Sequence, residues 1–387
     1  MRFVPHSFRL AGVVLLCAAT VPSQSRPNLA LKGVQLLDLE SGRYSAPSVV
    51  LISGARIDRI LPLAAYQPAL ADSTIDLTGR YLLPGLIDAH VHLTLAGPLR
   101  VNAQRALEKG FTTMVDLGAR DRRVIAYRDS VSSGALPGPR VLAAGLWIGI
   151  QGGVCEFGGI GVAGGAPAFR QRVRENVEAG ANVIKLCVSG WPAEAFANPD
   201  KHELSDDILA ASVEEAHRAG KLVIAHDLNR AGVAAGLRAG IDGLAHAAYL
   251  DSAVALELKR RNVFLIPTLA SLTSGDSSAA SRALVNSTRL AHQLGVRIVF
   301  GTDAGVIAHA NNAIEFAALR EAGLAPLDAI RAATSNAAAA LRLADSVGIV
   351  RPGMIADLIA LDADPLRDLQ VLRNPAFVMA RGRVLPR

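Results

Sequence analysis

Polar side chains that can bind metal stand at the ends of apolar segments of this sequence. The first such segment closes with His90-Val-His92, and residues two apart in a strand share a face, so both imidazoles can point the same way. Four of the nine histidines occupy such places, which independent structural histidines would not be expected to do. The sequence therefore predicts one metal site. Its predicted members are His90, His92, Lys185, His226, His246 and Asp303.

Lys185 is the unusual member of this set because it lies inside the apolar run Val183-Ile-Lys185-Leu-Cys187. Burying an ammonium group is costly, so its charge must be paired, neutralised or chemically changed. Reaction with CO₂ would turn the amine into a carbamate, a carboxylate able to bridge two cations. A lysine that pairs with a neighbouring acid, or that extends to the edge of the fold, remains the alternative.

The donor types indicate the metal and its chemistry. Imidazole and carboxylate without thiolate suit Zn²⁺, with Mn²⁺, Co²⁺ or Fe²⁺ as alternatives. A metal ion can lower the pKa of a bound water from roughly 15.7 to about 7. Asp303 would orient this water and carry its proton to the leaving group. The set therefore predicts a hydrolase that uses a metal-activated water.

Eight apolar strands, most of them followed by a helical segment, must position these side chains. Such alternation predicts a (β/α)₈ barrel, whose chemistry lies at the carboxyl ends of the strands, although a doubly wound open sheet shows the same alternation. The predicted strands are 86–92, 112–117, 140–144, 182–188, 222–226, 243–246, 263–268 and 297–303. The predicted helices are 101–109, 121–132, 168–179, 206–219, 231–239, 252–261, 278–294, 311–322 and 326–341.

Both ends of the chain are rich in short strands separated by turn signals. The N-terminal strands are expected at 28–39, 48–52, 56–61 and 74–77, and the C-terminal ones at 357–361 and 377–380. We expect the two ends to join into one small β-sandwich domain. The predicted domains are the sandwich, 24–81 plus 347–387, and the barrel, 82–346.

Residues 1–23 have the pattern of a secretory signal peptide. Arg2 and Arg9 precede an apolar run of about ten residues, too short to span a bilayer. A buried N-terminal helix is the alternative. The residue before Cys17 is Leu16, not the small residue that lipoprotein signals prefer, so lipidation is disfavoured. The sequence predicts a secreted or periplasmic protein.

The composition excludes several classes of protein. The 387 residues are 51% hydrophobic and 19% charged, enough for a large core. Losing Arg2 and Arg9 with the signal lowers the formal net charge from +6 to +4, and no basic cluster interleaves with aromatics, so nucleic-acid binding has no support. We expect a small-molecule substrate and no membrane span in the mature chain, and the chain could form a homo-oligomer.

Cys155 and Cys187 can pair, but we expect two separate buried thiols.

From Tyr81 to the C-terminus the chain resembles the amidohydrolase superfamily. That resemblance implies a distorted (β/α)₈ barrel beside a composite β-sandwich. It rests on Leu82-Leu-Pro-Gly-Leu-Ile-Asp-Ala-His90-Val-His92, Gly301-Thr-Asp303-Ala-Gly, Ala333-Thr-Ser-Asn-Ala and the segment from Gly348 to Asp362.

Within the superfamily, the segment from Gly180 to Gly190 is similar to the carbamylated-lysine strand of the imidazolonepropionase-like branch, which includes Xaa-Pro dipeptidases. The similarity implies two divalent cations. The implied ligands are His90, His92 and Asp303 for the first ion, His226 and His246 for the second, and the carbamate of Lys185 for both.

Substrate contacts follow the resemblance less closely. His309 matches a position that often precedes an Asn and a Glu, here Asn312 and Glu315, which implies substrate contact. The third-strand loop reads Gln151-Gly-Gly-Val-Cys-Glu156 where the branch usually has Gly-Gly-His, so one substrate-contacting histidine is absent. The loop from Trp191 to His202 also departs from the common pattern.

We expect hydrolysis of an amide bond in a dipeptide or an N-acyl amino acid. Tyr249 and Arg230 follow the histidine-bearing strands closely and are candidates to bind a substrate carboxylate. The same water attack would open a cyclic amide, a lactone or an ester. A non-catalytic metal-binding protein is a remote alternative, and a bridging Lys185 argues against a mononuclear deaminase.

Overall fold

The computed structural model describes residues 1, 27–198, 200–273 and 278–386. Apart from Met1, the predicted signal peptide therefore lies outside the described residues. Among the described residues, no helix has both the length and the apolar character needed to cross a bilayer.

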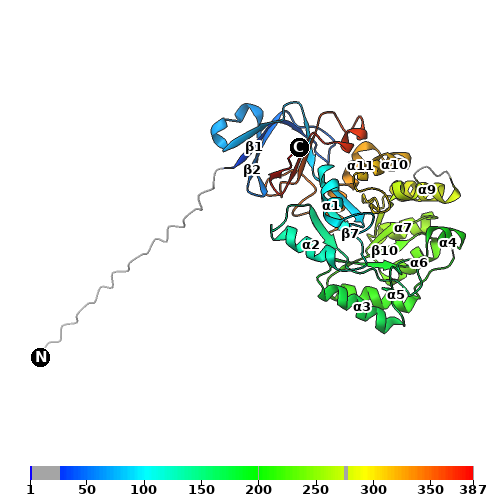
Figure 1. Ribbon diagram of the computed structural model, residues 1–387. Coiled ribbons are helices and arrows are strands. Elements are labelled where there is room, and N and C mark those ends of the chain that lie inside the picture. The colour runs from blue at the N-terminus through cyan, green and yellow to red at the C-terminus, as the bar shows by residue number, and fades with distance from the viewer. Residues whose placement is uncertain (2–26, 199, 274–277, 387) are drawn as a thin grey trace.

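Strands from both chain ends pair in one eight-stranded sheet. In it β5 (Tyr81–Pro84) lies between β1 (Leu29–Leu36), its parallel neighbour, and β13 (Leu358–Leu361), its antiparallel neighbour. Figure 1 shows these blue and dark red strands side by side at one end of the molecule. The other strands of this sheet are β2 (Ser48–Ser53), β3 (Arg56–Pro62), β4 (Ser73–Asp76), β14 (Phe377–Ala380) and β15 (Arg383–Val384).

Seven parallel strands form two further sheets, one of three strands and one of four. Every residue of β6, β7, β9 and β12 is buried, which fits strands that are covered on both faces. Backbone hydrogen bonds also join the two sheets, from Asn182 N to Ala143 O (2.8 Å) and from Cys187 N to Ile148 O (2.9 Å). The strands are β6 (Leu86–Val91), β7 (Phe111–Asp116), β8 (Arg140–Ala143), β9 (Val183–Cys187), β10 (Leu222–Asp227), β11 (Gly243–His246) and β12 (Phe264–Ile266).

The eighth predicted strand, 297–303, is not a regular strand. Its backbone still bonds to both neighbours, since Val299 N donates to Leu265 O (2.8 Å) and Ala89 N donates to Phe300 O (2.9 Å). Gly301 brings the segment so close to β6 that an added Cβ would lie 2.9 Å from that of His90. Asp303 then turns into the left-handed region, with φ of 56°, and this ends the extended conformation.

Helices surround the parallel sheets (Figure 1). In α5, two acidic residues in the first turn and His217 and Arg218 in the last complement the helix dipole. The short helices α4 and α8 were not expected, and the single helix predicted at 326–341 is two helices, α11 and α12. The α-helices are α1 (Leu99–Glu108), α2 (Arg123–Ser132), α3 (Ala166–Glu178), α4 (Pro192–Ala197), α5 (Asp206–Arg218), α6 (Arg230–Ala239), α7 (Ser252–Arg260), α8 (Leu269–Thr273), α9 (Ala279–Gln293), α10 (Glu315–Glu321), α11 (Pro326–Ala332) and α12 (Ser335–Ala340).

Cys155 and Cys187 form a disulfide, so the prediction of two separate thiols was wrong. The loop after β8 folds back onto the end of β9 and brings the two Cα atoms within 6.2 Å. Gly149 leaves the room for this, because a Cβ there would lie 3.1 and 3.2 Å from the Cβ atoms of the two cysteines. Spacing in sequence does not report such a long-range approach.

We predict that replacing both cysteines by serine lowers the free energy of unfolding by about 2–4 kcal/mol, because the unfolded chain then gains conformational freedom. Urea denaturation measures this difference. The unmodified protein in excess dithiothreitol should behave like the double variant, and equal midpoints with and without the disulfide would contradict the prediction.

Candidate metal centre

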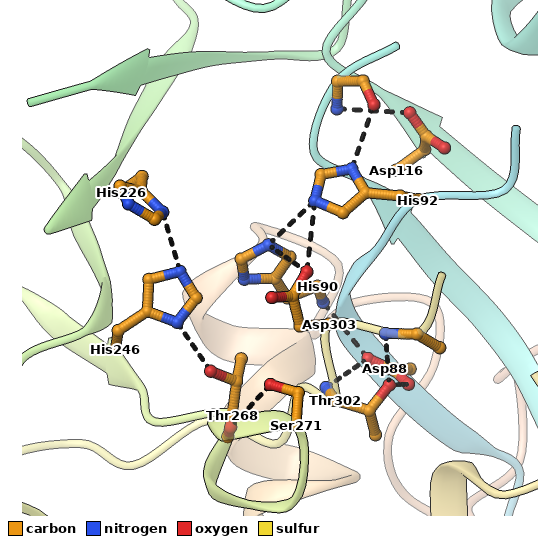
Figure 2. Close-up of polar contacts among 12 residues, drawn as sticks. Asp88, His90, His92, Asp116, His226, His246, Thr268, Ser271, Thr302 and Asp303 are labelled. Carbon is orange, nitrogen blue, oxygen red and sulfur yellow. Dashed lines mark hydrogen bonds and ion pairs between the residues drawn. The ribbon is translucent and has the colours of Figure 1, made fainter. Parts of the chain in front are cut away.

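The two histidines of the β6 region lie together, and His92 is oriented by a contact on its outer side. His92 Nδ1 donates to the carbonyl oxygen of Gly118 (3.0 Å), so its Nε2 atom carries the free lone pair. That Nε2 atom lies 3.4 Å from His90 Nε2. The pair is buried, and Figure 2 shows both rings turned toward the side chain of Asp303. The predicted sharing of one face is therefore present.

Asp303 reaches the histidine pair from the segment after Phe300. Its backbone N–H donates to His90 O (2.7 Å), which anchors it beside β6. Its Oδ1 atom lies 3.4 Å from His90 Nε2 and 3.2 Å from His92 Nε2. The left-handed backbone that aims this carboxylate is a strained conformation of the kind that concentrates at functional sites.

His246 and His226 form the second part of the group. His246 Nε2 lies 2.9 Å from His226 Nδ1, and the His246 and His90 ring centroids lie 5.2 Å apart. On the other side, His246 Nδ1 lies 2.6 Å from Thr268 Oγ1, which fixes the direction of the ring (Figure 2). His246 and Thr268 both have left-handed backbones, with φ of 77° and 49°.

Lys185 is buried in β9 next to these side chains. Its Nζ atom has no hydrogen-bond partner within the described residues. Burial lowers the pKa of Lys185 to about 7, although the charge of Asp303 opposes the shift. An amine that is substantially neutral near pH 7 can act as a nucleophile, which meets one requirement for carbamate formation.

The protonation states of the group suit metal binding. Burial lowers the pKa of His226 to about 3, and burial also holds the pKa values of His90 and His246 well below their usual range. Burial alone would raise the pKa of Asp303, but its electrostatic interactions with the His90 and His92 side chains outweigh burial and hold this pKa well below its ordinary value. The neutral imidazoles of His90, His226 and His246 and the ionised carboxylate of Asp303 are forms that bind cations. His92 differs, because its contact with Asp303 outweighs burial and raises its pKa.

His90, His246 and Asp303 could together hold a metal ion, since each offers one ligand atom and these atoms lie within 4.8 Å of one another. Several buried atoms at this place lack a hydrogen-bond partner among the described residues, which fits a bound ion that would satisfy them. These atoms are His90 Nδ1, Lys185 Nζ, His226 Nε2 and Asp303 Oδ1.

Supporting residues around the group were mostly missed from the sequence. Asp88 accepts hydrogen bonds from Thr302 Oγ1 (2.6 Å) and Asn312 Nδ2 (2.7 Å), and so ties β6 to the segment that carries Asp303. Asp116, at the end of β7, accepts from the N–H groups of Leu93 and Gly118. The strand-end rule that selected the histidines could have found Asp116.

The three residues predicted to contact substrate differ in burial and in their partners. His309 is buried beside the group, with Nε2 3.3 Å from the carbonyl oxygen of His92. Arg230 is exposed and pairs with Asp200 (2.5 Å). Tyr249 is 37% exposed, with its ring 6.3 Å from that of Phe196. Their contact with substrate stays a prediction.

Comparison with known proteins places this geometry in a family. Residues 81–385 match the amidohydrolase family. The ochratoxinase of Aspergillus niger is 30% identical over 355 residues, covering 77% of this chain and 73% of its own. An imidazolonepropionase of Nocardia farcinica is 27% identical over 335 residues, covering 78% and 81%.

A solved structure gives the same result. The crystal structure of a Xaa-Pro dipeptidase with bound methionine superposes with a TM-score of 0.85 at 26% identity, covering 93% of this chain and 100% of the dipeptidase chain. The expected resemblance is thus confirmed, as is the expectation of a hydrolase acting on carbon–nitrogen bonds. The chain belongs to the amidohydrolase family.

Proposed function

We propose that this protein is a metal-dependent amidohydrolase that cleaves the amide bond of a dipeptide or an N-acyl amino acid. The observation that carries the proposal is the buried carboxylate of Asp303 among the imidazoles of His90, His92 and His246, with the unpaired amine of Lys185 nearby. Similarity to a Xaa-Pro dipeptidase supports a substrate of this kind.

The donor set fits two divalent cations, of which Zn²⁺ is the preferred candidate. When bound, such cations would acidify a water molecule and polarise the scissile carbonyl group. The proposed ligands are His90, His92 and Asp303 for one ion, His226 and His246 for the other, and a carbamate on Lys185 between them.

The residues of the chain would divide the remaining work. Asp303 would accept the proton of the attacking water at a carboxylate oxygen and pass it to the leaving nitrogen. The carbonyl of Gly118 would hold His92 in the tautomer that leaves Nε2 free, and Thr268 would fix the direction of the His246 ring. Arg230 would have to leave Asp200 to reach a substrate carboxylate.

A substrate panel tests the proposal directly. Dipeptides, including prolyl ones, N-acyl amino acids, lactones and aryl esters should be offered to the protein before and after removal of divalent ions with a chelator. We expect hydrolysis of the amides, loss of activity on chelation and its return on adding Zn²⁺. Turnover of lactones or esters alone would overturn the proposal of an amide substrate. Turnover that resists the chelator would overturn the metal-dependent mechanism.

We predict that Thr268→Val weakens Zn²⁺ binding by about 10–100-fold, because His246 loses the partner that fixes its ring direction. Competition with a coloured chelator measures this affinity. Thr74→Val, at an exposed position in β4, is the matched control and should bind Zn²⁺ as the unmodified protein does. Equal affinity in both variants would remove Thr268 from the site.

The fold and location of the protein complete the proposal. The two parallel sheets together with residues 297–304 would form the (β/α)₈ barrel, 82–346, and the chain ends, 24–81 plus 347–387, would form the β-sandwich domain. Residues 1–23 would direct export to the periplasm or beyond. The disulfide between Cys155 and Cys187 supports export, since such bonds persist in oxidising compartments.

A further inference from the structure

Three aromatic rings extend in a row from the candidate metal centre to the protein surface. The ring centroids of Trp147 and Phe157 lie 4.6 Å apart, and those of Phe157 and Trp191 lie 5.6 Å apart. At the inner end, the Trp147 ring lies 5.3 Å from that of His92. We refer to Trp147, Phe157 and Trp191 as the aromatic row.

The inner end of the aromatic row is built tightly against the site. Gly118, whose carbonyl orients His92, allows Trp147 to pack directly on its backbone, because a Cβ there would lie 2.2 Å from Trp147 Cδ1. The loop that carries Phe157 is secured by the disulfide of Cys155 and by the carboxylate of Glu203, which accepts from Val154 N (3.1 Å). Trp147 and the loop that carries Phe157 are therefore held in place beside the site.

The outer end of the row is accessible. Trp147 is only 2% exposed, whereas Trp191, just after β9, is 49% exposed. Both tryptophans of the chain lie in this row, although aromatic residues are only 4% of the sequence. The guanidinium of Arg120 lies 5.5 Å from the Phe157 ring centroid, which places a cation against the middle ring of the row.

We propose that the aromatic row is a substrate subsite that binds an aromatic side chain next to the scissile amide. The inference rests on the proposed amidohydrolase function and narrows its substrates to those with a phenyl-type group. Stacked and edge-to-face rings bind one another beyond simple area burial, and the exposed face of Trp191 offers such a contact. Phe157 directly follows residues 151–156, and Trp191 begins residues 191–202, the two segments expected to depart from the pattern of the dipeptidase branch.

The kinetic test compares N-acetyl-L-phenylalanine with N-acetyl-L-alanine, and the dipeptides Phe-Ala and Ala-Phe with Ala-Ala. We expect kcat/KM to be about tenfold or more higher for an aromatic substrate, and Trp191→Ala to remove most of that preference. Trp191→Phe should retain it. Leu256→Ala on α7, which replaces an apolar residue that is 50% exposed, is the matched control and should leave kcat/KM unchanged for both kinds of substrate. Equal losses on both substrates in Trp191→Ala would overturn the subsite.

A binding test separates this inference from the proposed function. Because both tryptophans lie in the row, their fluorescence reports on its occupancy in chelator-treated protein, where no turnover occurs. N-acetyl-L-phenylalanine should change the emission saturably, and N-acetyl-L-alanine should not. Saturable binding without hydrolysis in the metal-loaded protein would keep the subsite and refute the amidohydrolase function. Hydrolysis of both N-acetyl compounds at equal efficiency without a fluorescence change would support the amidohydrolase function and refute the subsite.

Discussion

Asp303→Asn is expected to lower kcat by about 10²–10⁴-fold, because the amide has no carboxylate to take up the proton of the attacking water. The carboxylate is well prepared for this role. Its Oδ1 atom lies 3.2 Å from His92 Nε2 and 3.4 Å from His90 Nε2, and these side chains keep its pKa below the ordinary value despite burial, so the carboxylate is ionised and has a lone pair for the proton. Steady-state kinetics on the best amide of the substrate panel measures the effect.

Loss of a metal ligand could mimic loss of a proton carrier, so metal content must be measured in the same samples. We expect the fall in kcat to exceed the fall in bound metal by at least about tenfold. Asp362→Asn, which removes a largely exposed carboxylate paired with Arg80, should leave kcat unchanged. If activity declines only in proportion to the bound metal, Asp303 acts as a metal ligand and not as a proton carrier.

The strand-end histidines could be predicted because their chemistry shows directly in the sequence. The His90-Val-His92 spacing places both rings on one face, and the structure brings them together with Asp303, more than two hundred residues away. Apolar runs such as Val183-Ile-Lys185-Leu-Cys187 predict buried strands, and β9 is buried throughout. These features depend on local periodicity and polarity, which single-sequence reasoning can use.

Features that depend on contacts between residues far apart in the sequence could not be predicted. The disulfide depends on a loop folding back over Gly149, and the irregular segment before Asp303 depends on the contact of Gly301 with β6. The helix α8 was hidden because its start is set from a distance, by Glu315, whose carboxylate accepts from Leu269 N (3.0 Å) and Ala270 N (2.7 Å). Tertiary contacts of this kind override local preference.

Lys185→Ala is expected to reduce bound metal from two ions to one or none per chain, and to lower kcat/KM by more than the about 100-fold that loss of an outer-sphere partner can cost. The buried amine has no hydrogen-bond partner in the described part of the chain, so a structural ion pair does not account for it. Elemental analysis measures the ions. Lys259→Ala, at an exposed position on α7, is the matched control, and unchanged metal content in Lys185→Ala would defeat the bridging role.

The carbamate itself has a distinct signature in pH and CO₂. It forms when a neutral amine attacks the carbon of CO₂, making an N–C bond and releasing one proton. Burial brings the pKa of Lys185 to about 7, so the amine is protonated below that pH and reactive above it. Binding of two Zn²⁺ ions by chelator-treated protein should therefore increase from pH 6 to pH 8 and with added bicarbonate.

Formate or acetate should partly restore metal binding to Lys185→Ala, since either supplies the missing carboxylate. Full uptake in CO₂-free buffer at pH 6 would show that the amine binds no CO₂, and the site would then need another explanation for a buried, unpaired lysine.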